Sequence, residues 1–466
     1  MVSPRSLRSM SSSNAAPGTK RPADRDPTIS PPPLKRKAQS TITKSAVANF
    51  FTPTSQKPKE RTTWSERSPK QDTPATLLVA KYVPESEQAP EKKRKIAAFD
   101  LDSTLITTAS KNTHAKDAAD WKWWHHSVPG RVRDLHEKEG YQVVIFTNQG
   151  GLTLHPDPKA KAPKSLKDRV GAFKQKCNVV LGQLNIPTTL YAATANDVFR
   201  KPRPGMWKEL CKDYGLQDSE IDHENCIFVG DAGGRTATLD GKKKDFSCSD
   251  RNLAHNIGIR YQTPEEFFLG EAPREFTREF DLSKFPFTLS GEDTEDNAPL
   301  VEKKNEKDIV LFVGSPGAGK STFYHKYLKP LGYERVNQDA LKSRDKCVQA
   351  AGDFLSEGDS IVIDNTNPDP TTREQWVKLA RKFKVPIRCV WFKTPVRICE
   401  HNDMARAMND LLNPESRQSL PRLAFNTYAS KFKEPKLDEG FQDIIQVDFK
   451  FRGTEEEYGL WGRYWL

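Results

Sequence analysis

Cysteine is scarce and unpaired in this sequence. Seven cysteines are spread over 466 residues, and no two of them form a Cys-x-x-Cys pair. An odd number without such pairs argues against a disulfide framework and favours a reducing compartment. Long apolar runs are also missing: no stretch approaches the roughly 20 residues that span a bilayer, and the N-terminus has no apolar signal core. We therefore expect a soluble, intracellular protein.

A general excess of positive charge is absent outside the N-terminal segment. The chain has 73 Lys and Arg and 62 Asp and Glu residues, which gives a net charge of +11. Nineteen of the basic and eight of the acidic residues lie within residues 1–95, so this segment holds the whole excess. Because the remaining chain is balanced, an anionic partner must be met by local patches rather than by a global field.

The N-terminal segment, residues 1–92, is rich in Pro, Ser, Thr and Lys and poor in aliphatic side chains. This composition predicts a disordered tail. A solvated charge run is one interpretation of its basic residues. The other is a two-part nuclear import signal, which predicts a nuclear location and an import receptor as partner. The two clusters that suggest the signal are Lys20-Arg21 and Lys35-Arg36-Lys37.

Apolar strand-like runs alternate with helical patterns over residues 93–270 and again over residues 307–466. Such alternation predicts parallel α/β sheets covered by helices on both faces. The charged stretch 271–306 has few large apolar residues and predicts an exposed linker. We therefore expect two α/β domains behind the tail. The first domain also has a cluster of three tryptophans, Trp121, Trp123 and Trp124. Their near-helical spacing predicts core packing, and stacking on an exposed base is the alternative.

The stretch GSPGAGKS, residues 314–321, fits the pattern G-x-x-x-x-G-K-[ST] between an apolar strand and a helix. Small residues let successive backbone N–H groups close around phosphates, Lys320 reaches the β and γ oxygens, and Ser321 can hold Mg²⁺. The pattern therefore predicts an ATP and Mg²⁺ site, formed by Gly314, Gly317, Gly319, Lys320, Ser321 and Thr322.

Three further residues are candidates for the chemistry of phosphoryl transfer. Asp339 follows a strand and is placed to take the proton of an attacking hydroxyl, although a helix N-cap is the alternative role for it. Asp364 ends another strand and can hold the water shell of the metal. Arg406 lies on a later helix suited to a lid over the triphosphate. For Asp364 and Arg406, a structural salt bridge is the alternative.

Polar residues also follow successive strands of the first domain. The carboxyl ends of parallel strands meet at one edge of a sheet, where ligands bind. We therefore expect one crevice to contain Asp100, Asp102, Thr147, Asn148, Lys201 and Asp231. Asp245 and Asp250 follow Asp231 closely in the sequence and are expected at the same edge.

The set suits the removal of a phosphate. Asp100 would attack phosphorus to form an acyl-phosphate, and Asp102 would protonate the leaving oxygen and later activate water. Mg²⁺ would be held by Asp100, Asp231 and a backbone carbonyl, with Asp102 counted in the metal site. Thr147 and Lys201 would hold the phosphoryl oxygens. A plain acidic turn is the alternative for the Asp-x-Asp pair alone.

The motifs of both domains resemble the eukaryotic polynucleotide kinase 3′-phosphatases. In the first domain these are FDLDSTL, VIFTNQGG, RKPRPGMW and FVGDAGGR, which match a haloacid dehalogenase-like, Rossmann-type phosphatase. In the second they are VGSPGAGKSTF, RVNQD and IDNTNPD, which match the P-loop kinase of the same proteins. The resemblance implies an enzyme that hydrolyses 3′-phosphates and transfers the ATP γ-phosphate to 5′-hydroxyl ends of broken DNA. It also implies the roles given above to Asp100, Asp102, Asp231, Lys320 and Asp339.

The N-terminal segment departs from the family pattern. Animal members begin with a forkhead-associated domain, and residues 1–95 are too short and too poor in apolar residues to form one. A stretch at 44–51, KSAVANFF, instead resembles a sliding-clamp-binding peptide, with Val47, Phe50 and Phe51 as its apolar plug and Lys44 in place of the usual Gln. A chance match is the alternative for this short motif. We expect a monomer.

Other functions remain open at this point. A kinase and a phosphatase acting on small molecules, or an enzyme that repairs RNA ends, would share these motifs. Basic loops at 200–203 and 242–244 suit a nucleic-acid backbone, which favours a polynucleotide over a small molecule. A non-catalytic scaffold would carry decayed motifs, and these motifs are intact.

Overall fold

The computed structural model describes residues 61–85, 93–113, 115–156, 165–287 and 301–466. The basic clusters expected to bind an import receptor lie outside the described residues, and so does the clamp-binding motif with Val47, Phe50 and Phe51. No helix in the described chain is long and apolar enough to cross a membrane.

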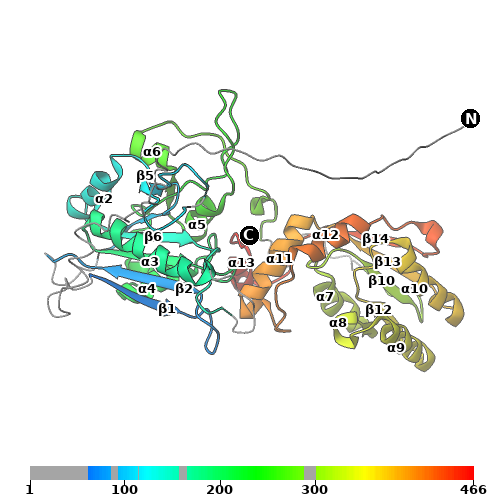
Figure 1. Ribbon diagram of the computed structural model, residues 1–466. Helices are drawn as coiled ribbons and strands as arrows, with labels where there is room; N and C mark the ends of the chain where they lie inside the picture. Colours follow the sequence, from blue (N-terminus) through cyan, green and yellow to red (C-terminus); the bar gives the residue numbers. More distant parts are fainter. Residues whose placement is uncertain (1–60, 86–92, 114, 157–164, 288–300) are drawn as a thin grey trace, which may run out of the picture. The chain divides into compact units, whose positions relative to one another are not determined.

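The first domain is built on a seven-stranded sheet in the order β1-β2-β7-β6-β3-β8-β9 (Figure 1). From β7 to β9 every neighbouring pair is parallel, whereas β1 and β2 run antiparallel at one edge. The strands are β1 (Thr62–Arg67), β2 (Leu77–Tyr82), β3 (Lys95–Phe99), β6 (Tyr141–Asn148), β7 (Thr188–Ala193), β8 (Ile227–Val229) and β9 (Arg260–Gln262).

The strands β1 and β2 correct the expectation that residues 1–92 form a disordered tail. Leu77, Leu78, Val79 and Ala80 are fully buried, because β2 pairs with β7 and its side chains enter the cores on both faces of the sheet. The apolar run of β2 is short and lies among Pro, Ser and Lys residues. Composition averaged over the whole segment therefore hid it.

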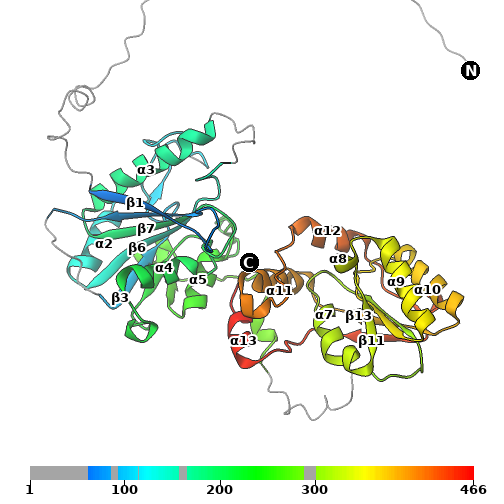
Figure 2. The ribbon, with the colours of Figure 1, turned by 90° about the horizontal axis from the view of Figure 1, so that it is seen from below.

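Helices cover both faces of this sheet, as predicted. One core joins the sheet to α2 (Val128–Glu137) and α3 (Ser165–Leu184), and the other joins it to α4 (Gly205–Tyr214) and α5 (Ser249–Ile257). Figure 2 shows α3 and α4 on opposite sides of the strands. A short helix, α6 (Pro264–Leu269), follows β9, and a small hairpin joins β4 (Ile106–Thr107) to β5 (Lys122–Trp123). The three tryptophans near this hairpin pack against the first core, which confirms the packing interpretation.

Most described residues of the stretch 271–306 are exposed, and a few apolar residues within it contact the domains. Phe276 pairs with Arg235 through a β-bridge, and Leu282, in the 3-10 helix η3 (Leu282–Lys284), is 5% exposed. Val301 is 3% exposed and joins a core of the second domain. Single apolar residues among many charges carry this packing, so the average composition did not reveal it.

The second domain has a five-stranded, fully parallel sheet in the order β11-β12-β10-β13-β14. Its strands are β10 (Ile309–Val313), β11 (Tyr333–Val336), β12 (Ser360–Ile363), β13 (Ile387–Phe392) and β14 (Ile444–Val447). Its helices are α7 (Lys320–Phe323), which continues as the π-helix η4 (Tyr324–Leu328), α8 (Gln338–Leu341), α9 (Arg344–Glu357), α10 (Pro370–Phe383), α11 (Val396–Met408), α12 (Arg422–Lys431) and α13 (Glu455–Trp461).

Helices again cover both faces of the second sheet. The helices α9 and α10 build the core on one face, and α7 with η4 contributes to the core on the other. The predicted architecture of two parallel-sheet α/β domains is thus confirmed. The P-loop follows the carboxyl end of a strand in the second sheet, and the acidic motifs follow the carboxyl ends of strands in the first.

Candidate active sites

The P-loop joins β10 to α7, as its sequence predicts. Gly317 has a φ of +73°, and a Cβ added to it would lie 2.2 Å from the Cys399 carbonyl oxygen. The close packing of this loop against the start of α11 therefore requires glycine at position 317. Gly319, with a φ of +95°, precedes the first residue of α7. These backbone conformations turn the loop around the space in front of the helix.

Lys320 is 9% exposed. Its Nζ donates to the carbonyl oxygens of Gly314 and Ser315, at 2.9 and 2.7 Å. Burial lowers the pKa of this ammonium, and Asp364 and Asp339 partly offset the effect. The side chain is thus folded back along the loop, close to where phosphate oxygens would replace its carbonyl partners.

Ser321, in the first turn of α7, meets Asp364, which directly follows β12. The Ser321 hydroxyl donates to Asp364 Oδ2 at 2.9 Å, and the Asp364 side chain is 1% exposed. Arg335, which the sequence had not singled out, donates from Nε and Nη2 to Asp364 Oδ2 and from Nη2 to the Ser321 hydroxyl. A hydroxyl beside a carboxylate is an oxygen donor set that suits Mg²⁺, so the residues present fit a metal at this point.

Asp339 is not the helix N-cap that the sequence left open. Asn337 caps α8, and its Oδ1 accepts from the backbone N–H groups of Asp339 and Ala340. The Asn337 amide also donates to the Asp364 carbonyl oxygen at 2.7 Å, which ties α8 to the end of β12. The carboxylate of Asp339 therefore has no capping role, and its side chain is 81% exposed. Its exposure makes it accessible to a substrate hydroxyl, although Arg417 Nη1 lies 3.9 Å from its Oδ2.

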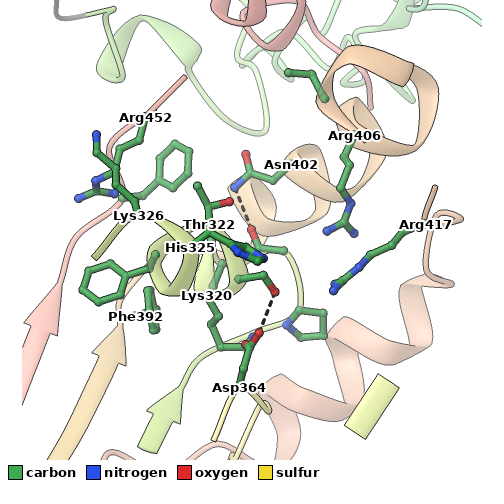
Figure 3. A pocket seen from close by; sticks show the side chains of 18 of the residues that line it. Lys320, Thr322, His325, Lys326, Asp364, Phe392, Asn402, Arg406, Arg417 and Arg452 are labelled. Atoms are coloured by element: carbon green, nitrogen blue, oxygen red, sulfur yellow. Dashed lines mark hydrogen bonds between the residues drawn. The ribbon is translucent and has the colours of Figure 1, made fainter. Parts of the chain in front are cut away.

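A cavity of about 1290 Å³ brings these residues together. Its wall includes the P-loop from Pro316, Thr322, Asp339, Asp364 and, from the far side, several cationic side chains. Figure 3 shows Arg406 and Arg417 reaching in opposite Lys320 and Asp364. Arg406 Nη2 donates to Asp403 Oδ1 at 2.6 Å. The predicted lid helix therefore contributes Arg406 to the cavity wall, and Arg406 also forms the salt bridge to Asp403 that was its alternative role.

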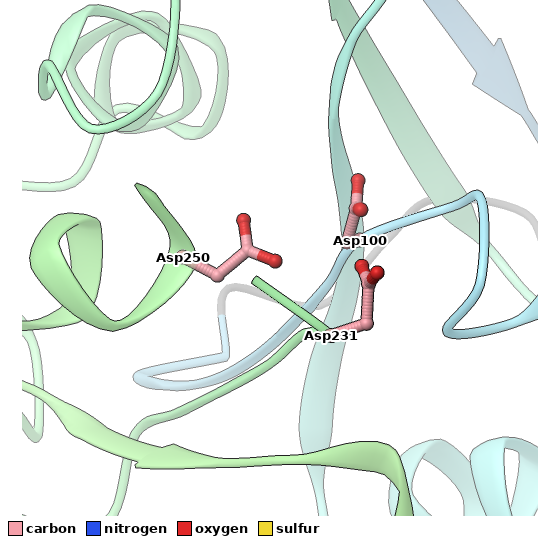
Figure 4. A group of neighbouring side chains, drawn as sticks. All are labelled: Asp100, Asp231 and Asp250. Atoms are coloured by element: carbon pink, nitrogen blue, oxygen red, sulfur yellow. The ribbon is translucent and has the colours of Figure 1, made fainter. Parts of the chain in front are cut away.

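The acidic residues of the first domain meet at the carboxyl edge of its sheet. Asp100 follows β3, Asp231 follows β8, and Asp250 lies in the first turn of α5 (Figure 4). One carboxylate oxygen from each lies within 4.8 Å of the other two. A Cβ at Gly230 would lie 2.2 Å from Asp250 Oδ2, so glycine is needed for this approach.

Lys201 lies between two of these acids. Its Nζ is 2.7 Å from Asp100 Oδ1 and 2.8 Å from Asp250 Oδ1, and the residue is 4% exposed. Asn148 holds the loop that carries it, because its side-chain amide bonds to the backbone N–H and carbonyl of Lys201. Burial lowers the pKa of Lys201, but the carboxylates of Asp100 and Asp250 outweigh it and raise the pKa to about 12.

Negative charge in this crevice exceeds what Lys201 can neutralise. Burial raises the pKa of Asp100 to about 7, with Asp250 and Asp102 adding to the rise while Lys201 opposes it. Burial, together with Asp100 and Asp250, raises the pKa of Asp231 to about 8. Three clustered carboxylates with one ammonium fit a divalent cation bound by oxygen atoms.

Asp102 stands apart from this cluster. Its side chain is 53% exposed, accepts from Gln149 Nε2 at 2.7 Å and lies 3.3 Å from Lys176 Nζ. The structure places Asp250 in the acidic cluster, and the Asp102 carboxylate outside it. Thr147, 1% exposed at the end of β6, accepts from the same Gln149 amide at 2.8 Å. Gln149 therefore connects Thr147 and Asp102.

The loop after β8 is fixed at its base by Asp245. The Asp245 carboxylate pairs with Arg235 and accepts from the backbone N–H groups of Gly233 and Arg235. Because Gly233 and Arg235 lie two and four residues after Asp231, these contacts fix the backbone beside the acidic cluster. Asp245 is thus placed in a supporting position and not in the cluster itself.

Comparison with known proteins agrees with the two domains. Residues 95–268 match the family model described as polynucleotide kinase 3 phosphatase, and residues 309–347 and 345–435 match an AAA domain. The bifunctional polynucleotide phosphatase/kinase of Schizosaccharomyces pombe is 36% identical over 389 residues, which cover 83% of this chain and 86% of that protein. The chain belongs to the bifunctional polynucleotide phosphatase/kinase family.

Two shorter matches concern the phosphatase half of this polynucleotide phosphatase/kinase. A polynucleotide 3′-phosphatase of Arabidopsis thaliana is 33% identical over 178 residues, covering 38% of this chain and 24% of that protein. A polynucleotide 3′-phosphatase of Saccharomyces cerevisiae is 28% identical over 227 residues, covering 40% of this chain and 92% of that protein. The resemblance stated from the motifs, and the pairing of a phosphatase with a kinase, are confirmed.

Proposed function

We propose that this polynucleotide phosphatase/kinase prepares broken DNA strands for joining, by hydrolysing 3′-phosphates and phosphorylating 5′-hydroxyls with ATP. The observation that carries the proposal is the presence of two complete sites in one chain. The acids around Lys201 stand at the carboxyl edge of one sheet, and the P-loop with Asp339 stands at that of the other. A strand break that carries a 3′-phosphate and a 5′-hydroxyl needs both reactions before it can be joined.

In the phosphatase site, the Asp100 carboxylate attacks the phosphorus of the 3′-phosphate and forms an aspartyl-phosphate. Asp102 gives a proton to the 3′-oxygen as its bond to phosphorus breaks, and later takes a proton from the water that hydrolyses the intermediate. Lys201 and Thr147 hold phosphoryl oxygens, while Asn148 positions the Lys201 loop through its two backbone hydrogen bonds.

Three acidic residues would hold Mg²⁺ in this site: Asp100, Asp231 and Asp250. The ion, when bound, offsets the repulsion between these carboxylates and the substrate phosphate. In the kinase site, Ser321 and Asp364 would hold the Mg²⁺ that accompanies ATP.

In the kinase site, the P-loop binds the triphosphate with Lys320 at the β and γ oxygens. Asp339 takes the proton from the 5′-hydroxyl as its oxygen bonds to the γ-phosphorus. The bond from the γ-phosphorus to the bridging oxygen breaks, and ADP leaves. Arg406, which lines the cavity from α11, would bind phosphate oxygens of the triphosphate through its charge.

A nuclear location goes with this function. The two basic clusters of the N-terminal segment support import, and the KSAVANFF stretch supports recruitment by a sliding clamp. Fusing residues 1–60 to a fluorescent protein tests the import signal. Nuclear accumulation is expected, and loss of it on changing Lys35, Arg36 and Lys37 to alanine identifies the signal; an even distribution of the unaltered fusion contradicts it.

A gapped DNA duplex with a 3′-phosphate and a 5′-hydroxyl at the gap tests the proposed function. With ATP and Mg²⁺ both ends should be converted, and without ATP only the 3′ end. An excess of matched RNA should inhibit little; equal competition favours the RNA alternative. Equal or better turnover of mononucleotides would contradict a polynucleotide substrate. The Asp339→Asn variant is the internal control, because it should lose only the 5′-end reaction.

A further inference from the structure

A second lid arginine, Arg417, lies beside the base of the proposed kinase reaction. Arg417 belongs to residues 409–421, here termed the lid loop, which connect α11 to α12. Its Nη1 is 3.9 Å from Asp339 Oδ2, and its side chain is 27% exposed. In Figure 3 its guanidinium points into the cavity from the side opposite the P-loop.

The lid loop holds this guanidinium in a defined place. Asn413 Oδ1 accepts from the Arg417 backbone N–H, and Asn413 Nδ2 donates to the Arg417 carbonyl, both at 2.8 Å. Glu415 Oε2 accepts from Arg417 Nε at 2.7 Å and pairs with Nη2 at 2.5 Å. The lid loop is itself tied to α11, because Leu420 N–H donates to Asp403 Oδ2 at 2.7 Å.

Glu415 links Arg417 to the residues that would hold the metal. Its other oxygen, Oε1, lies 3.5 Å from Arg335 Nη1. Arg335 in turn donates to the Ser321 hydroxyl and to Asp364. A continuous chain of ion pairs therefore runs from Asp364 through Arg335, Glu415 and Arg417 to Asp339.

Three members of this chain, Asp364, Arg417 and Asp339, line the cavity in which phosphoryl transfer would take place. Lys320 and the Ser321–Asp364 pair bound it on the P-loop side, and Asp339 bounds it on the acceptor side. Lys320, Asp339 and Arg417 all line this one cavity. A cation at the position of Arg417 would face the oxygens of a phosphoryl group transferred in this cavity.

We propose that Arg417 is a catalytic residue of the kinase, whose guanidinium binds the γ-phosphoryl oxygens during transfer, and that Glu415 is the residue that positions it. The inference rests on the proposed kinase function. As the 5′-oxygen bonds to phosphorus and the bridging oxygen leaves with ADP, Arg417 exchanges Asp339 for the phosphoryl oxygens. Asp339 is then released to take the hydroxyl proton.

Steady-state kinetics of Arg417→Gln test the proposal. We expect kcat for 5′-phosphorylation to fall by at least about 100-fold, because arginines that stabilise a transferred phosphoryl group contribute on the order of 10³ or more. KM for ATP should change little, and 3′-dephosphorylation should keep its full rate. Arg417→Lys should recover little, because an ammonium cannot reproduce the planar fork of a guanidinium. Glu415→Gln should show a smaller fall in kcat, of about tenfold.

The matched control is Arg422→Gln. Arg422 begins α12 just after the lid loop, is 71% exposed, lies 3.7 Å from Glu400 and does not line the cavity. Its removal should leave kcat unchanged. Added guanidinium, at concentrations that do not denature the protein, should partly restore Arg417→Ala and should not affect Arg422→Ala.

Two outcomes separate this inference from the proposed function. If Lys320→Ala and Asp339→Asn lose kinase activity while Arg417→Gln keeps kcat within about threefold, the role of Arg417 is wrong and the kinase assignment stands. If Lys320→Ala and Asp339→Asn keep full kinase activity, the proposed function of this site is wrong. An Arg417→Gln variant that loses ATP binding as well as kcat, without guanidinium rescue of Arg417→Ala, contradicts a transition-state role.

Discussion

At Gly317 the backbone of the P-loop and the first turn of α11 are nearly in contact. The Cys399 carbonyl oxygen would lie 2.2 Å from an added Cβ, and the φ of +73° is unfavourable for any residue that has one. An alanine therefore forces either the loop or α11 to move. Because Arg406 is on α11 and Lys320 is on the loop, such a movement changes the width of the ATP cavity.

We accordingly expect Gly317→Ala to raise KM for ATP or lower kcat of the kinase by at least about tenfold, since displacements near 1 Å can cost two orders of magnitude in rate. The phosphatase should be unaffected. Gly459→Ala is the matched control, because a Cβ on that helical residue of α13 meets nothing within 4 Å. Equal kinase activity of Gly317→Ala and the unaltered protein would contradict the requirement for glycine.

At the scale of elements, α11 is joined to α13 through a buried histidine. His401 Nε2 donates to the Trp461 carbonyl oxygen at 2.9 Å, and its ring lies 5.1 Å from that of Phe280 and 5.3 Å from that of Trp461. Nδ1 has no hydrogen-bond partner among the described residues. Burial lowers the pKa of His401 to about 4. The neutral ring is therefore part of the helix packing.

This packing predicts a pH dependence. In the unfolded chain His401 has a pKa near 6.5, so as the pH falls below that value the unfolded state takes up a proton first, and the stabilisation present above pH 6.5 is lost toward pH 4. Near pH 5 the loss is about 2 kcal/mol. Hydrogen exchange of α11 amides should accelerate correspondingly between pH 7 and 5, after correction for the intrinsic pH effect. His401→Gln, which keeps a donor but does not titrate, should lack this additional acceleration.

The sequence predicts a site residue when the element that carries it has a recognisable pattern. Asp100, Lys201 and Asp231 were predicted because each follows a strand of a parallel sheet, and those ends meet at one edge. Asp250 was expected near the same edge because it follows Asp231 closely in the sequence. Arg335 and Arg417 also reach the kinase site, Arg335 from within a strand and Arg417 from a loop, so no strand-end pattern marks them as neighbours. Their approach depends on long-range packing.

At the scale of the whole molecule, the boundary of the phosphatase domain decides which truncations fold. Removing residues 1–60 should leave both activities intact in vitro. Removing residues 1–92 also deletes β1 and β2, which exposes the edge of β7 and the apolar surface that β2 covers. We expect this second truncation to lose phosphatase activity and to unfold at a lower temperature or aggregate. Equal melting temperatures and phosphatase rates of the two truncations would contradict the seven-stranded sheet.

The two activities should be separable, because each site is built on its own sheet and core and no described residue is shared between the two sets. Asp100→Ala removes the nucleophile and should abolish 3′-dephosphorylation while 5′-phosphorylation continues at an unchanged rate. Lys320→Ala should do the reverse. Both reactions are measured on the same gapped duplex, with Lys378→Ala, an exposed residue of an ion pair on α10, as the control for surface changes. Loss of both activities in either soluble variant, with an unchanged melting temperature, would mean that one site depends on the occupancy of the other.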